Sequence, residues 1–195
     1  DGKPFKTREG GVMRLEYLLK DINEEMLKKI EKTRPEETEA EAIAKTVGLA
    51  AVKYGDLSNQ ASKDYIFDVD RFTSSEGNTG PYILYTIVRI KSILKKYEEQ
   101  GRVIGDTAIL PCTSESEKAL MLELTKFNAV MENAFEELAP HKVCAYIYDL
   151  ANAFNKFYHE TKILAEEDGT KQASWIQLLI LTRRVLETCI DVLGF

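Results

Sequence analysis

Residues 77–97, GNTGPYILYTIVRIKSILKKY, constrain the fold more than any other part of the chain. The first four residues of this stretch are typical of a turn, and Pro81 stands where the first residue of a helix is expected. Apolar side chains then recur at helical spacing, at Ile83, Ile87, Ile90, Leu94 and Tyr97. The stretch therefore predicts a long helix with one face in a hydrophobic core.

The opposite face of the predicted helix carries a second row with the same spacing, which consists of Tyr82, Tyr85, Arg89, Ser92 and Lys96. Tyrosine can stack on a nucleobase, arginine can stack or bind a phosphate, and lysine adds positive charge. The same spacing also fits a solvent-exposed face with two partly buried tyrosines. It fits the contact face of a helical protein-interaction module as well. These residues therefore leave both RNA binding and protein binding open.

The composition is that of a globular chain with an all-α fold. The chain has 195 residues, of which 44% are hydrophobic and 30% charged, and its apolar residues recur at helical rather than alternating periods. We expect a helical bundle of about five or six long helices. The longest apolar runs are too short to span a membrane, so no membrane partner is expected. Three widely spaced cysteines without a CxxC pair predict neither a disulfide framework nor a metal site, and they are typical of a cytoplasmic protein.

The charge distribution limits the kind of nucleic-acid binding that is possible. A formal net charge of -6 argues against a chain that simply coats nucleic acid, and no DNA partner is expected. The acidic excess lies between Glu31 and Glu41. A local basic surface elsewhere on the chain is therefore still compatible with reading one RNA.

Capping signals and apolar spacing predict the helices of the first half of the chain. Residues 12–32 form one amphipathic pattern. Thr38, with Glu41 three residues later, predicts the start of a second helix that ends near Gly55. Residues 64–69 alternate weakly and are compatible with a short strand.

Similar signals predict the helices of the second half. Ser114 and Glu117 form a capping-box pattern, and the helix that follows runs to Pro140 with Leu138 in its buried row. Pro140 is suited to the first position of the next helix. The last helix carries a heptad-like row of mainly apolar residues that ends at Leu193.

Three segments resemble the C-terminal part of arginyl-tRNA synthetase, a class I family, in wording, order and spacing. They are residues 53–58 (KYGDLS), 64–71 (DYIFDVDR) and 76–82 (EGNTGPY), the last followed by Tyr85 and Arg89. The resemblance implies that residues 33–195 form the α-helical anticodon-binding domain of these enzymes, the DALR domain. Residues 1–32 would then link it to a catalytic domain.

The first residues resemble the KMSKS signature loop of class I synthetases, although their composition alone is also that of a frayed terminus. The resemblance implies that Lys6 stabilises the pyrophosphate of ATP, within a loop that includes Lys3, Phe5, Thr7 and Arg8. The other signature of the class, His-x-Gly-His, is absent from the sequence. We therefore expect this chain to be inactive alone. ATP with Mg would serve the full-length enzyme, and no cofactor is expected on this chain.

The remaining predicted contacts lie in the last two helices. Residues 151–164 resemble a family segment that places a tyrosine, here Tyr158, near the anticodon loop, while Asn152 and Asn155 stand where relatives often have histidine. The full set of residues predicted to contact tRNA is Tyr82, Tyr85, Arg89, Lys96, Tyr158, Lys162, Arg183 and Arg184.

The resemblance implies the function of arginine–tRNA ligase, with the tRNA for arginine, arginine and ATP as partners of the full-length enzyme. The sequence leaves the oligomeric state open, and a monomer is expected. Two alternatives are a non-catalytic protein-interaction module and the helical part of another class I synthetase, such as the cysteinyl enzyme. The sequences of residues 5–8 and 77–82 argue against the cysteinyl enzyme.

Overall fold

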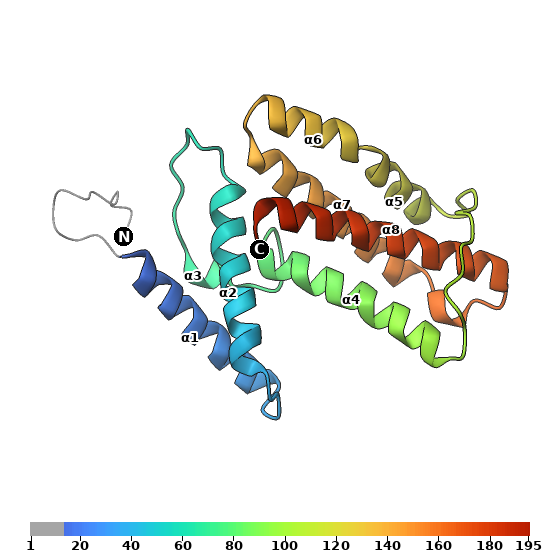
Figure 1. The fold of residues 1–195 in the computed structure, drawn as a ribbon, viewed down its shortest axis with the longest axis horizontal. Helices are drawn as coiled ribbons and strands as arrows, with labels where there is room; N and C mark the ends of the chain where they lie inside the picture. The colour runs from blue at the N-terminus through green and yellow to red at the C-terminus, as the bar shows by residue number, and fades with distance from the viewer. Residues whose placement is uncertain (1–13) are drawn as a thin grey trace. The chain divides into compact units, whose positions relative to one another are not determined.

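The computed structural model describes residues 14–195, and all regular secondary structure in this range is helical (Figure 1). The predicted all-α fold class is confirmed, and five of the helices have 18 or more residues. No helix in the described range is long and apolar enough to cross a membrane. The elements are α1 (Leu15–Thr33), α2 (Ala40–Leu57), α3 (Val69–Phe72), α4 (Gly80–Glu99), α5 (Glu115–Thr125), α6 (Phe127–Glu136), α7 (Pro140–Glu160), the 3₁₀ helix η2 (Ile163–Ala165) and α8 (Gly169–Leu193).

The chain divides into two compact units. The first unit extends to Tyr82 and includes Phe195, and the second unit comprises residues 83–194. The division lies in the first turns of α4. The functional boundary expected between residues 32 and 33 stays a prediction.

In the first unit, α1 packs against α2 through a small apolar cluster. Ile22 and Met26 of α1 are buried with Ala44 of α2. Helix α2 also approaches α3 closely at Gly55, where a Cβ atom would lie only 2.4 Å from the ring of Phe72 in α3. The described part of the amphipathic pattern thus forms one helix, α1, whose middle turns are buried against α2.

Two local predictions in the first unit are wrong. The capping box at Thr38 does not form, because the chain is still in a turn there and α2 begins at Ala40 after an N-cap without a side-chain bond. The carboxylate of Glu37 instead accepts a hydrogen bond from the backbone N–H of Glu39, at 3.3 Å. No strand occurs at residues 64–69, where the ring of Phe67 lies against that of Phe72 with centres 4.7 Å apart.

In the second unit, the predicted apolar rows are buried. The five core residues predicted for α4 are at most 6% exposed. The row of α8 is buried along its length, at Trp175, Leu179, Thr182, Leu186, Cys189 and Leu193. Helix α7, which begins with Pro140 as predicted, packs against α5, α6 and α8. The burial of its apolar row determines which face of α4 is left for other contacts.

The helix expected from Ser114 to Pro140 is broken, and its predicted buried row is only partly correct. The chain leaves α5 after Thr125 and re-enters a helix, α6, at Phe127. Leu138 is 83% exposed because its backbone has a positive φ of 49°, which ends the helical path after Glu136. The N–H of Ala139 then bonds back to the carbonyl of Ala134 at 2.8 Å, and this bond closes the turn into α7.

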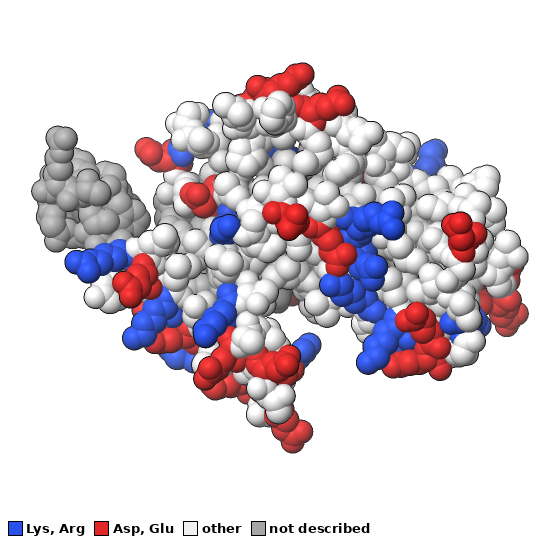
Figure 2. Space-filling view, in the orientation of Figure 1, with Lys and Arg blue, Asp and Glu red and all other residues white. Residues whose placement is uncertain are grey.

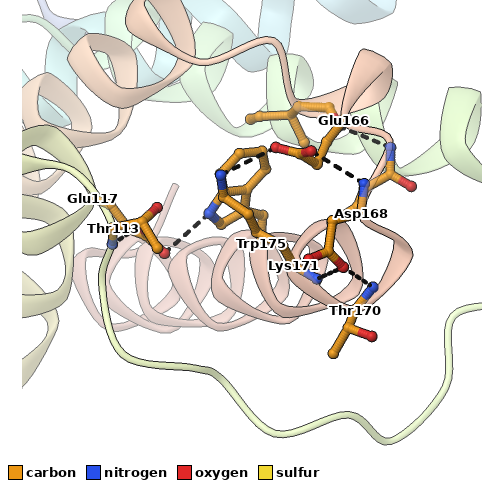
Figure 3. A network of polar contacts seen from close by, with 9 residues as sticks. Thr113, Glu117, Glu166, Asp168, Thr170, Lys171 and Trp175 are labelled. Carbon is orange, nitrogen blue, oxygen red and sulfur yellow. Dashed lines mark hydrogen bonds and ion pairs between the residues drawn. The ribbon is translucent and has the colours of Figure 1, made fainter.

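A buried carboxylate anchors the long connection between α4 and α5 (Figure 3). Glu117 is 1% exposed, and its Oε2 accepts hydrogen bonds from the backbone N–H and the hydroxyl of Thr113, at 2.7 and 2.9 Å. Its Oε1 accepts the indole N–H of Trp175 in α8, at 3.0 Å. Ser114 caps α5 as predicted, but the reciprocal bond goes to Thr113 rather than to Ser114. Glu117 therefore ties the start of α5 to α8.

The start of α8 has its own polar contacts around the same indole ring (Figure 3). Asp168 caps α8 by accepting hydrogen bonds from the N–H groups of Thr170 and Lys171, at 2.9 and 3.2 Å. The ammonium of Lys171 lies 4.7 Å from the centre of the Trp175 ring and 3.2 Å from the carboxylate of Glu166. The side chain of Trp175 is thus held by both an acceptor at its N–H and a cation over its face.

Glu117→Gln is expected to lower the free energy of unfolding by about 1–3 kcal/mol, because the new NH₂ group would face either the indole N–H of Trp175 or the backbone N–H of Thr113, and neither can accept a hydrogen bond. Urea unfolding measures this change. Glu115→Gln, an exposed change in the same helix turn, serves as the matched control and should change the free energy by less than about 0.5 kcal/mol. Equal stability of the two variants would show that the Glu117 contacts do not hold the connection.

Candidate nucleic-acid interface

Helices α4 and α7 bring three of the predicted contact residues together within the second unit. The Cζ atom of Arg89 in α4 lies 4.7 Å from the centre of the Tyr85 ring and 5.1 Å from the centre of the Tyr158 ring in α7. Its Nη2 donates a hydrogen bond to the Tyr85 hydroxyl at 2.9 Å. The guanidinium therefore lies against two aromatic rings from different helices. We call these residues, together with Asn155, the Tyr–Arg cluster.

Asn155 joins the two helices beneath the rings. Its side-chain oxygen accepts a hydrogen bond from Nη1 of Arg89, and its Nδ2 donates to the hydroxyl of Thr86 at 3.2 Å. Asn155 is 8% exposed and Thr86 is fully buried. Sequence reasoning left the role of Asn155 open. Its position three residues before Tyr158 places both residues on one face of α7, and this spacing is the sequence feature that points to a shared site.

The cluster is accessible to a ligand mainly through Tyr85, which is 47% exposed. Arg89 and Tyr158 are half-buried, and the Tyr158 ring lies nearly parallel to that of Phe154, with centres 6.1 Å apart. An exposed tyrosine ring beside a held guanidinium can offer a base a stacking surface and a phosphate a charged donor. The arrangement thus combines the two chemistries that single-stranded RNA binding requires.

The other predicted contact residues are not members of the Tyr–Arg cluster. Tyr82 is half-buried and belongs to the first unit, whereas Lys96, Lys162 and Arg184 are exposed in the second unit. Arg183 is half-buried, with its Nε 3.6 Å from the carboxylate of Glu187.

Basic side chains also lie on α4 and α8. Figure 2 shows a band of Lys and Arg side chains across this side of the second unit, with carboxylates beside it. The carboxylate of Glu187 in α8 forms ion pairs with Lys91 of α4, at 2.8 Å, and with Arg183. The charge of this band is therefore partly neutralised, and the unpaired positive charge available to a phosphate is smaller than the residue types suggest.

The predicted ATP-facing residues lie outside the part of the chain that the structure describes. These are Lys3, Phe5, Lys6, Thr7 and Arg8.

Two protein-family models match the chain. The model of the DALR anticodon binding domain matches residues 83–195, and the model of the class I tRNA synthetase (R) catalytic domain matches residues 1–69. The first match begins where the second compact unit begins. The Tyr–Arg cluster lies entirely within it.

Several proteins are similar to this chain along its whole length. An arginine–tRNA ligase of Agathobacter rectalis is 67% identical over 100% of this chain and 34% of its own length, and one of Alkaliphilus oremlandii is 54% identical over 100% and 33%. The solved structure of Thermus thermophilus arginyl-tRNA synthetase matches with a TM-score of 0.85 at 27% identity, over 95% of this chain and 32% of that one. The chain spans about a third of the length of these relatives. With the match to residues 83–195, these similarities show that the chain belongs to the DALR anticodon-binding domain family and that its relatives are arginine–tRNA ligases.

Proposed function

We propose that residues 83–195 bind the anticodon loop of a tRNA for arginine, and that the full-length protein is an arginine–tRNA ligase that uses ATP to attach arginine to this tRNA. The observation that carries the proposal is the Tyr–Arg cluster, in which Arg89 lies between Tyr85 and Tyr158. The cluster lies within the segment that matches the anticodon-binding family.

The cluster suits the way in which proteins read RNA loops. Single-stranded loops are recognised by splaying their bases onto aromatic side chains or guanidinium planes. Each stacked base contributes about 1–3 kcal/mol whatever its identity, so stacking on the Tyr–Arg cluster would supply affinity. Hydrogen bonds to the edges of the splayed bases would supply the discrimination between tRNAs. Arg89 then supplies a guanidinium that can stack on a base or bind a phosphate and that is already held in place by Asn155.

The other predicted residues are proposed to bind the backbone of the same tRNA. Lys96, Lys162 and Arg184 are exposed and can contact phosphates, with an affinity that falls as salt rises. Tyr82 and Arg183 are further proposed tRNA contacts. Arg183 contributes less charge because Glu187 lies beside it.

The first residues are proposed to act on ATP in the full-length enzyme. Lys6, with Lys3, Phe5, Thr7 and Arg8 in the same loop, would place mobile positive charge at the pyrophosphate of Mg-bound ATP as the charge develops. Arginine activation would then require the catalytic domain, and this chain alone would bind no cofactor. We also propose that residues 33–195 serve tRNA recognition, and that the protein is a cytoplasmic monomer without a DNA partner; sedimentation of the full-length protein tests the monomer.

The anticodon proposal is tested by titrating this chain with two transcripts at two salt concentrations. One is an arginine-accepting tRNA, and the other is the same tRNA with its middle anticodon base changed. We expect tighter binding of the unchanged transcript at both salt concentrations, since a base contact depends less on salt than a phosphate contact does. Equal binding of both transcripts would indicate a general basic surface, and binding of neither would favour the protein-interaction alternative.

Lys6→Ala in the full-length protein is expected to slow arginine activation, because the variant lacks one cation at the pyrophosphate. Pyrophosphate exchange measures this step, and tRNA binding should be unaltered. Normal exchange by the variant would remove Lys6 from the proposed mechanism. Lys118→Ala, an exposed change in α5, controls for the loss of one positive charge.

A further inference from the structure

We infer that Asn155 is a positioning residue that fixes the Arg89 guanidinium for RNA before the RNA arrives. The inference rests on the proposed RNA contact of the Tyr–Arg cluster. It assigns a function to a buried side chain that does not itself reach the ligand.

The hydrogen bonds leave the Asn155 amide only one orientation. The guanidinium of Arg89 consists of donors alone, so the amide must turn its oxygen toward Nη1. Its Nδ2 then faces the hydroxyl of Thr86, which accepts at 3.2 Å. A reversed amide would place an NH₂ group against the guanidinium. Because Asn155 is 8% exposed and Thr86 is fully buried, the hydrogen bond between these two side chains is shielded from solvent.

Asn155 supplies a constraint that α4 cannot supply by itself. The bond from Nη2 of Arg89 goes to Tyr85, which lies one turn earlier on the same helix. That bond keeps the guanidinium near Tyr85 but does not connect it to α7. Asn155 lies in α7 one turn before Tyr158, so its bond to Nη1 fixes the guanidinium relative to Tyr158 as well.

A fixed guanidinium matters because an arginine side chain is otherwise flexible. Immobilising a flexible side chain upon binding costs affinity, and a side chain that is already ordered in the free protein avoids most of that cost. Removing Asn155 should therefore weaken RNA binding even though the side chain is buried. The loss should appear only when Arg89 is present.

A double-mutant cycle tests this dependence with the anticodon stem–loop of an arginine-accepting tRNA as the probe. Asn155→Ala should raise Kd by roughly two- to tenfold, which corresponds to the cost of ordering one flexible side chain. In an Arg89→Ala background, the same change should leave Kd unaltered. Asn128→Ala, which removes an exposed asparagine from α6, is the matched control and should change neither value. Equal losses in both backgrounds would overturn the inference, because they would show a general structural effect.

A second measurement on the free protein separates this inference from the proposed function. In ¹⁵N spectra, a guanidinium held at both nitrogens gives separate Nη signals, whereas a freely rotating one gives a single averaged signal. We expect separate Arg89 signals in the native chain and one averaged signal in Asn155→Ala, with Arg89→Lys identifying the signals. Separate signals in Asn155→Ala would overturn the inference whether or not RNA binds.

A conservative variant covers the case in which Asn155→Ala does not fold. Asn155→Asp keeps an oxygen acceptor for Arg89, and the Thr86 hydroxyl can donate to the second oxygen. This variant should retain the separate Arg89 signals, and an averaged signal in folded Asn155→Asp would contradict the inference. Native Arg89 signals with no binding of the stem–loop would reject the proposed function while the positioning of Arg89 stands.

Discussion

The hydrogen bonds of the Asn155 amide join α4 to α7, and the candidate site depends on that junction. One face of α4 is buried through Ile83, Ile87, Ile90, Leu94 and Tyr97, so the opposite face has a fixed direction. Apolar burial is not directional, however, and it does not set the position of one polar group against another. The bonds from Asn155 to Arg89 and Thr86 supply that direction, because a buried amide without these partners would cost about 1–3 kcal/mol.

Glu117 has a comparable role at another point of the second unit. Its carboxylate is surrounded by donors from Thr113 and Trp175, and it therefore connects the chain before α5 to α8. Asn155 and Glu117 are both buried polar groups with their hydrogen bonds formed. Buried polar groups of this kind restrict the alternative packings of a helical core, because every shifted packing leaves a donor or acceptor unpaired. The buried hydrogen bonds of Asn155 and Glu117 thus help to fix how the helices of the second unit pack, and this packing positions the Tyr–Arg cluster.

Spacing in the sequence predicts the faces of the helices but not the partners across them. The buried rows of α4 and α8 follow directly from helical periodicity, and the placement of Tyr85 and Arg89 on one face does too. Tyr158 was predicted from a family resemblance, because its neighbour Arg89 is far away in the sequence. The hydrogen-bond partners of Asn155, and the bond from the Thr113 N–H to Glu117, depend on tertiary packing. Local sequence patterns do not contain this information. The break between α5 and α6 and the exposure of Leu138 were missed for a related reason, since apolar periodicity continues through both.

The most direct test of the account replaces Tyr85 with a photo-cross-linking phenylalanine derivative and maps the RNA positions that become attached. Tyr85 is suited to this because it is 47% exposed and lies beside Arg89. A derivative at Leu122, which is 53% exposed in α5, provides the comparison. The account predicts cross-links from position 85 within the anticodon loop of an arginine-accepting tRNA, and none there from position 122. Cross-links from position 85 to other parts of a bound tRNA, or none at all, would contradict the assignment of the Tyr–Arg cluster to the anticodon.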